Sequence, residues 1–204
     1  MLYKISKNVL DFLLSVLAII ILLPAFIVLI ILIKASSKGP AVFKQTRAGK
    51  NGKPFTFYKF RTMKIDVDPF GPSPKSGADL RLTKTGIFLR KYSLDELPQL
   101  FNIVKGNMSF VGPRPLYVAQ IAEWNEEQKK RLLVKPGLTG LAQIRGRGEI
   151  TIEQKLAFDV EYVKTASFFL DLKIIFLTVL QVLTGKSIYE KKYSETQDTR
   201  GYRN

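Results

Sequence analysis

Two adjacent carboxylates, Asp95 and Glu96, are the residues of this chain whose types are best suited to chemistry. The chain contains no His and no Cys, which excludes Cys/His zinc sites, iron–sulfur clusters, thiol nucleophiles and Ser-His-Asp triads. Any acid, base or nucleophile must therefore be a carboxylate, Lys, Tyr or a hydroxyl. By themselves these two residues favour a structural role, because Ser93-Leu94-Asp95-Glu96 matches the Ser-x-x-Glu capping box that opens a helix.

Several arginines in irregular segments favour a chemical role for Asp95 and Glu96 over a structural one. Arg90 shortly precedes the carboxylates, and four more arginines lie in glycine- and proline-rich or turn-adjacent segments: Arg61, Arg114, Arg145 and Arg147. The planar guanidinium of Arg matches the oxygens of a phosphate. Each arginine alone is more often a surface residue, but together with paired carboxylates they indicate chemistry on a phosphate ester. A divalent metal would bridge the like charges.

The charge distribution points to an anionic partner. The chain has 204 residues with 32 Lys+Arg against 17 Asp+Glu, a net charge of +15. Such a charge fits nucleic acid, an acidic membrane surface or a phosphorylated substrate. An uncharged, almost wholly aliphatic run from Phe12 to Ile33 favours the membrane. As a helix, this run is long enough to cross a hydrocarbon core of about 30 Å.

Pro24 lies near the middle of this run and is expected to kink or break the helix. Lysines flank the run on both sides: Lys4, Lys7, Lys34 and Lys38. Positive charge at both ends is compatible with a hairpin that enters and leaves on the cytoplasmic face. A simple kinked span remains the alternative.

The rest of the chain is predicted to be mostly helical with a small β-hairpin. Val42-Phe43 and Phe55–Tyr58 flank an Asn-Gly turn. One helix is expected from the cap at Ser93 to about Val104, one over 119–134, and mainly helical structure over 152–183. The apolar run 174–180 is too short to span a bilayer and would lie along the interface or pack on the anchor. The fold class is therefore α+β, with a membrane-embedded N-terminal helix and a globular domain that carries interfacial amphipathic helices.

Four blocks of sequence carry a resemblance to a known family. They are FYKFRTM (57–63), SLDELPQLFN (93–102), SFVGPRP (109–115) and KPGLTGLAQ (135–143). In this order they are similar to the bacterial sugar transferases, the monotopic phosphoglycosyl transferases. The likeness is to the short form, such as the enzyme that starts Campylobacter N-glycosylation. It implies a membrane anchor over 1–38, a catalytic domain over 39–185 and a polar tail over 186–204.

The resemblance implies transfer of a phosphosugar from a UDP-sugar to a polyprenyl phosphate, normally undecaprenyl phosphate, with release of UMP and dependence on Mg²⁺. Asp95 would be the nucleophile, would form an aspartyl–phosphosugar intermediate and would also contact the metal. Glu96 would be its partner carboxylate, with proton removal from the lipid phosphate as one possible role. Pro24 would break a re-entrant helix whose two ends are both cytoplasmic.

The resemblance also implies substrate-binding residues. Arg90, Arg114 and Arg147 match positions expected near phosphates. Lys59 and Arg61 would bind substrate or face anionic lipid, and Arg145 is either a sugar-selecting residue or a surface charge. The expected location is the cytoplasmic face of the bacterial inner membrane, with anionic lipid and no nucleic acid as partners. The donor sugar and the glycoconjugate pathway stay open. The oligomeric state also stays open, with a homo-oligomer as one alternative.

Two other classes of function remain in view. A non-catalytic membrane-anchored adaptor for anionic lipid or nucleic acid would account for the charge and the anchor, but not for the carboxylates among Arg-bearing turns. A signal-anchored hydrolase facing outward would place the basic residues on the side of the membrane that the charge bias disfavours.

Overall fold

A computed structural model describes residues 2–67, 74 and 76–184 of the chain. The predicted polar tail, 186–204, lies outside the described residues. The described chain is mostly helical, with two small two-stranded sheets. The prediction of a mostly helical α+β fold is therefore confirmed at this level.

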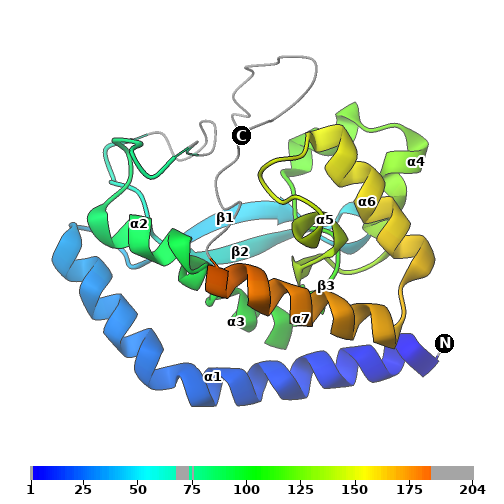
Figure 1. Ribbon diagram of the computed structural model, residues 1–204, viewed down its shortest axis with the longest axis horizontal. Helices are drawn as coiled ribbons and strands as arrows, with labels where there is room; N and C mark the ends of the chain where they lie inside the picture. Colours follow the sequence, from blue (N-terminus) through cyan, green and yellow to red (C-terminus); the bar gives the residue numbers. More distant parts are fainter. Residues whose placement is uncertain (1, 68–73, 75, 185–204) are drawn as a thin grey trace.

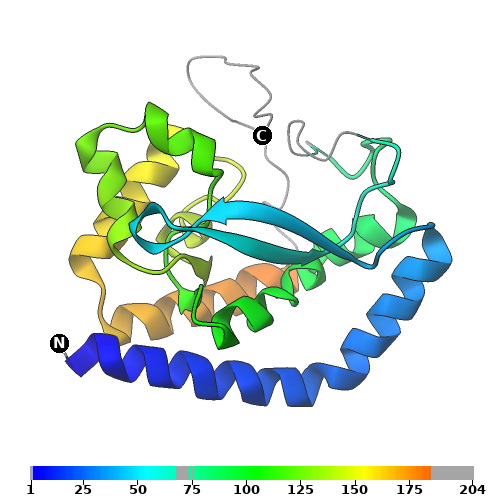
Figure 2. The same ribbon diagram turned by 180° about the vertical axis from the view of Figure 1, so that it is seen from behind.

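The first helix, α1 (Leu2–Ser36), is the longest element and contains Pro24. It runs along one edge of the molecule and bends in its middle (Figures 1 and 2). The helix continues through the proline, so the expected break is absent and the change of direction is a bend. Proline removes one helical hydrogen bond, and its ring displaces the carbonyl four residues earlier, which is sufficient to bend a helix without ending it.

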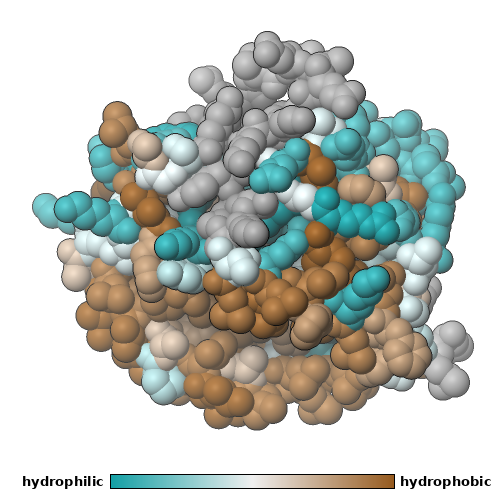
Figure 3. Space-filling model, in the orientation of Figure 1, coloured by the Kyte–Doolittle hydropathy of each residue, from teal (hydrophilic) through white to brown (hydrophobic). Residues whose placement is uncertain are grey.

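Most of α1 presents apolar side chains to the outside. Within the stretch Ile5–Ser36, the most apolar window has a mean hydropathy of 3.5 and is 17% buried, and the stretch is long and apolar enough to cross a membrane. Exposed apolar residues also cover much of α7 (Phe168–Thr184), including Phe169 and Phe176. Figure 3 shows hydrophobic side chains gathered over the part where α1 and α7 lie, with hydrophilic ones on the opposite part. The molecule thus has one broad apolar side, as a membrane-anchoring helix requires.

The predicted hairpin is confirmed. β1 (Val42–Ala48) pairs antiparallel with β2 (Pro54–Phe60), in a register from Val42↔Phe60 to Ala48↔Pro54. The turn contains a short 3-10 helix, η1 (Lys50–Gly52), in which Asn51 and Gly52 have φ of 57° and 73°. Asn and Gly adopt this left-handed conformation at low cost, so the Asn-Gly pair sets the turn.

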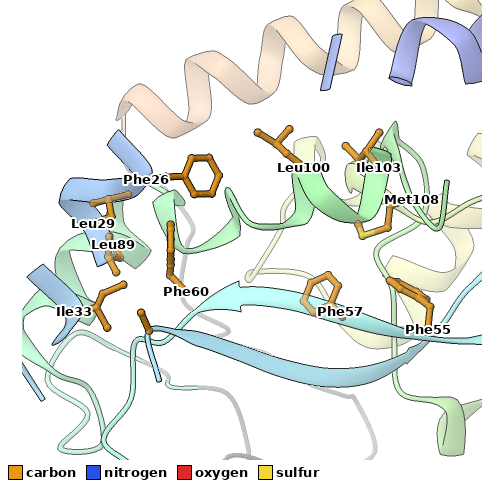
Figure 4. Close-up of a cluster of buried hydrophobic side chains, with 11 residues drawn as sticks. Phe26, Leu29, Ile33, Phe55, Phe57, Phe60, Leu89, Leu100, Ile103 and Met108 are labelled. Atoms are coloured by element: carbon orange, nitrogen blue, oxygen red, sulfur yellow. The ribbon is translucent and has the colours of Figure 1, made fainter. Parts of the chain in front are cut away.

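The main core joins α1 to the hairpin and to two short helices, α2 (Lys84–Lys91) and α3 (Gln99–Val104). Figure 4 shows the apolar side chains of these elements side by side. Phe26 of α1 lies with its ring centre 5.6 Å from Phe60 and 5.7 Å from Phe101. Leu89 and Met108 are fully buried in the same cluster. The C-terminal half of α1 is thereby packed on the domain that it anchors.

A buried polar contact fixes the other half of α1. The Asp171 carboxylate on α7 accepts hydrogen bonds from Lys7 Nζ at 2.6 Å, Tyr3 Oη at 2.8 Å and Tyr162 Oη at 2.7 Å. Asp171 is 7% exposed, so each of its partners compensates for the cost of burying its charge. Tyr162 belongs to α6 (Ile152–Thr165), which together with α7 confirms the mainly helical structure predicted for 152–183.

A second, parallel sheet joins β3 (Ser109–Val111) to β4 (Gly137–Thr139). Between these strands lie three short pieces, η3 (Val118–Glu123), α4 (Glu126–Lys129) and η4 (Lys130–Leu133). The predicted single helix over 119–134 is therefore wrong. The chain is extended at Trp124 and Asn125, and the Asn125 side chain accepts from the backbone N–H of Gln128, which starts a new helix there.

Gly86 allows α2 to lie directly against the chain that follows β2. A Cβ atom at this position would stand 2.0 Å from the Thr62 carbonyl oxygen. We expect Gly86→Ala to displace α2 and to reduce the free energy of unfolding by about 1–3 kcal/mol. Thermal unfolding of the purified variant tests this, with Lys84→Ala on the exposed side of α2 as the control. Equal stability of both variants would contradict the close contact.

Candidate functional site

The two predicted carboxylates lie on a short 3-10 helix, η2 (Leu94–Glu96), immediately before α3. Ser93 has a left-handed φ of 54° and makes no side-chain cap, so the predicted capping box is wrong. Its hydroxyl instead accepts a hydrogen bond from Arg147 Nη2 at 2.7 Å. The predicted end of the helix at Val104 is confirmed. With the capping role removed, burial of Asp95 and Glu96 needs another explanation.

Glu96 is held by two cations. Its Oε1 accepts from Lys59 Nζ at 2.9 Å and from Arg114 Nη2 at 2.7 Å, and the residue is 8% exposed. Burial opposes ionisation, but Arg114 and Lys59 outweigh it and hold the pKa of Glu96 well below its usual range. Glu96 is thus a buried, paired anion that fixes both cations in place.

Asp95 is equally buried but less engaged. Its Oδ2 lies 3.5 Å from Lys59 Nζ, a longer contact than either ion pair of Glu96. Burial raises the pKa of Asp95, with the attraction of Lys59 opposing and the adjacent Glu96 adding to the rise. Of the two carboxylates, Asp95 therefore has the oxygens with fewer competing contacts and the greater basicity.

Both carboxylates line a cavity of about 470 Å³, a volume typical of small-molecule sites. Five cations also line this cavity: Lys59 of β2, Arg61 just after β2, Arg90 of α2, Arg114 and Arg147. Arg90 Nε donates to Thr62 Oγ1 at 2.9 Å, and Arg147 has a φ of 50° just after α5 (Leu141–Ile144). The structure thus brings five of the six predicted binding cations to one cavity with the dyad.

Arg61 lines the cavity, but its guanidinium group donates hydrogen bonds to backbone carbonyls next to α1. Its Nη2 donates to the Ser37 carbonyl at 2.9 Å, and its Nη1 donates to the Lys38 carbonyl. These carbonyls immediately follow the C-terminal end of α1 (Leu2–Ser36), where a cation also complements the helix dipole. Arg61 therefore ties the anchor helix to the hairpin.

Arg145 is the predicted binding residue that the structure does not bring to the cavity. Its Nη1 and Nη2 donate to the Glu161 carboxylate at 2.6 and 2.8 Å, on the outer surface of α6. About two fifths of each side chain of this pair is exposed. The geometry corresponds to the surface-charge alternative.

The residues present fit a magnesium ion only if the ligand supplies most of the coordination. Within the described ranges no group of three acidic, His or Cys side chains could hold a metal. Mg²⁺ is commonly bound through one or two carboxylates together with substrate phosphates. Asp95 can provide such a carboxylate, whereas Glu96 Oε1 is occupied by Lys59 and Arg114. The site therefore suits a metal that arrives with a diphosphate.

Sequence reasoning missed a buried ion pair that lines the same cavity. Arg131 donates to Asp159 Oδ2 from Nε at 3.0 Å and from Nη2 at 2.7 Å, and each residue is 2% exposed. Arg131 Nη2 also donates to the Arg114 carbonyl at 2.5 Å, which supports the segment that carries Arg114. Arg131 ends a run of three basic residues, and such a run is typical of a solvated surface.

A second unpredicted cation, Arg47 of β1, also lines the cavity. Its guanidinium lies 3.6 Å from the ring centre of Tyr117, and its Nη2 donates to Gln45 Oε1 at 2.6 Å. Strand alternation could have indicated that Arg47 shares a face with Gln45, but not that this face borders the dyad.

The sequence of this chain matches a known protein family. Residues 2–185 match the family described as bacterial sugar transferase. The chain is 48% identical over 182 residues to the uncharacterized sugar transferase EpsL of Bacillus subtilis, with 89% of this chain and 87% of that protein covered. It is 46% identical to the galactosyl transferase CpsE of Streptococcus agalactiae, where 82% of this chain covers only 40% of the relative.

A further relative extends the comparison. The UDP-glucose:undecaprenyl-phosphate glucose-1-phosphate transferase of Caulobacter vibrioides is 41% identical over 197 residues, covering 91% of this chain and 72% of that protein. The chain therefore spans most of some relatives and less than half of others. The match extends from the apolar helix to the end of α7 and includes all four sequence blocks. This chain belongs to the bacterial sugar transferase family.

Proposed function

We propose that this protein moves a sugar 1-phosphate from a UDP-sugar to a polyprenyl phosphate, normally undecaprenyl phosphate, and releases UMP. The observation that carries the proposal is the buried Asp95–Glu96 dyad, set among Lys59, Arg114 and Arg147 in a cavity of a molecule with one broad apolar side. A carboxylate surrounded by fixed cations suits attack on a phosphate, and an apolar side gives access to a lipid acceptor. The names of the relatives add UDP-glucose and undecaprenyl phosphate as substrates of that kind.

In the first step, an oxygen of Asp95 forms a bond to the phosphorus that bears the sugar. The bond from that phosphorus to the bridging oxygen of the diphosphate breaks, and UMP leaves with the electron pair. An aspartyl–phosphosugar intermediate remains. Arg114 and Arg147, already fixed by Glu96 and Ser93, stabilise the negative charge that develops on the phosphate oxygens.

In the second step, a phosphate oxygen of the lipid acceptor attacks the same phosphorus. The Asp95 carboxylate leaves, and the product is a polyprenyl diphosphate sugar. Because Glu96 Oε1 accepts from both Lys59 and Arg114, we assign Glu96 the orientation of these two cations. Removal of a proton from the lipid phosphate by Glu96 stays a prediction from the family resemblance.

Magnesium, when bound with the donor, would neutralise the diphosphate and help UMP to leave. Asp95 is the residue placed to hold it. Lys59 Nζ lies 3.5 Å from Asp95 Oδ2, and this contact orients the carboxylate that attacks.

For the membrane, we propose that α1 enters and leaves on the cytoplasmic face of the inner membrane. The bend of α1 at mid-length, the lysines at both of its ends and the apolar side shared with α7 support this arrangement. Anionic lipid headgroups would interact with the many lysines and arginines of the chain, which has a net charge of +15.

The test of the proposed function is UMP release by the full chain in detergent, with Mg²⁺, undecaprenyl phosphate and a panel of UDP-sugars that begins with UDP-glucose and UDP-galactose. Release with one or two of these donors, dependent on the lipid acceptor over many turnovers, is the expected result. A non-catalytic adaptor or a hydrolase of another substrate class would release no UMP from any donor.

Arg114 gives a specific prediction within this mechanism. We expect Arg114→Ala to lower kcat/KM by about 10²–10³-fold, because a fixed donor to the developing charge is lost and Glu96 loses one partner. Arg145→Ala is the matched control, since it removes an exposed arginine whose ion pair lies outside the cavity. Initial rates of UMP release measure both. An equal fall in the two variants would contradict the placement of Arg114 at the reacting phosphate.

A further inference from the structure

The cavity has a wall whose polar groups are buried without partners. Within the part of the chain that the structure describes, the Gln143 side-chain Nε2 and Oε1 and the Asp159 Oδ1 have no hydrogen-bond partner. Gln143 is 8% exposed and Asp159 is 2% exposed. An unpaired buried donor or acceptor costs about 1–3 kcal/mol, so such a group commonly marks a place that a ligand or an ordered water fills.

This wall lies next to the cations of the dyad. Gln143 is on α5, one turn before Arg147, and Asp159 is on α6, against which α5 packs. Arg131 joins Asp159 to the Arg114 carbonyl, and Arg114 in turn contacts Glu96 at 2.7 Å. Asp159 therefore lies one side chain beyond Arg114, and Gln143 lines the same cavity.

The chemistry of these groups is that of hydroxyl recognition. An amide supplies one donor and one acceptor, and a carboxylate oxygen supplies a further acceptor. Neighbouring hydroxyls of a sugar ring both donate and accept, and they match this set. The positive charge of Arg131 is already paired with the Asp159 carboxylate, so this guanidinium is not placed to bind a second phosphate.

We propose that Gln143 and Asp159 form a subsite for a hydroxyl-bearing ring of the nucleotide-sugar donor, adjacent to its diphosphate. This inference rests on the proposed function, which supplies the donor. Two rings flank the diphosphate of a UDP-sugar, the ribose and the transferred sugar, and both present neighbouring hydroxyls. The two sources differ in one respect: UMP contains the ribose and lacks the transferred sugar.

The test is calorimetric binding of UMP and of UDP-sugars to the full chain in detergent. Wild type is compared with Gln143→Leu, which keeps the volume and removes the amide, and with Asp159→Asn, which keeps the shape and the hydrogen bond to Arg131. Gln99→Leu is the matched control, because Gln99 is 1% exposed, also has an unpaired Nε2, and does not line the cavity. Thermal unfolding of each variant confirms that it is folded.

We expect Gln143→Leu and Asp159→Asn each to weaken binding of the UDP-sugar about tenfold, with Gln99→Leu unchanged. A loss confined to UDP-sugars assigns the subsite to the transferred sugar, and an equal loss for UMP assigns it to the ribose. Unchanged binding in both variants overturns the subsite and leaves a water-filled wall. Failure of wild type to bind any UDP-sugar contradicts the proposed function itself, and the subsite with it.

Discussion

Replacement of Asp95 by Asn is expected to lower the transfer rate on the order of 10⁴-fold, the scale seen when one member of a catalytic unit is removed. Asn has the shape of Asp but lacks the negative oxygen that forms the bond to phosphorus. The buried position and the pairing of Glu96 with Lys59 and Arg114 stay in place, so the cavity keeps its form. The loss should therefore appear in kcat, while UMP still binds.

The control for this variant is Asp79→Asn. Asp79 is paired with Arg81 at 2.7 Å and does not line the cavity, so its loss removes the same charge without touching the dyad. We expect wild-type rates from the control. Initial rates of UMP release at saturating donor measure both variants. Transfer by Asp95→Asn at more than a few per cent of the wild-type rate would exclude Asp95 as the nucleophile.

The second large effect concerns stability. Arg131→Met is expected to reduce the free energy of unfolding by about 3–5 kcal/mol, because it leaves the Asp159 carboxylate buried and without its cation. Arg145→Met is the matched control, since its ion pair with Glu161 is exposed and should contribute at most about 1 kcal/mol. Denaturant or thermal unfolding of the full chain compares the two. Equal losses would contradict the burial of the Arg131–Asp159 pair.

The deficit of Arg131→Met should also depend on pH. Burial raises the pKa of Asp159 above its ordinary value of 3.8, with Arg131 opposing the rise. Removal of Arg131 raises this pKa further. A carboxyl whose folded pKa is raised is most compatible with folding when protonated, and its cost grows as pH rises from about 3.8 through the raised pKa. The stability gap to wild type should therefore narrow on acidification, and a gap that widens would contradict this account.

The sequence was informative where a pattern is local and repeated. The apolar run, the Asn-Gly turn between two aromatic strands and the helical periodicity over 152–183 all correspond to observed elements. Each depends on neighbouring residues alone, through hydropathy, turn conformation or spacing. The dyad with arginines from distant segments was found by residue type, and the structure brings five of the six predicted cations to its cavity.

Features that depend on tertiary contacts could not be predicted. Ser93 matches a cap by sequence, yet its hydroxyl is taken by Arg147, which lies far along the chain. Trp124 is buried against the Arg131 guanidinium, and this packing interrupts what periodicity alone describes as one helix. Arg131 and Arg145 look alike as sequence, but one is buried in an ion pair and the other is exposed. Burial of a charge depends on a partner that spacing does not reveal.

The most direct test of the mechanism is the intact mass of the protein after mixing with its UDP-sugar and Mg²⁺ in the absence of lipid acceptor. Attack by Asp95 predicts a mass increase equal to one sugar phosphate less one water, located at Asp95 by peptide mapping, with one UMP formed per chain. Addition of undecaprenyl phosphate should then remove the added mass. Rapid transfer in the presence of acceptor, without any adduct or UMP in its absence, would show a direct displacement and would contradict the covalent role of Asp95.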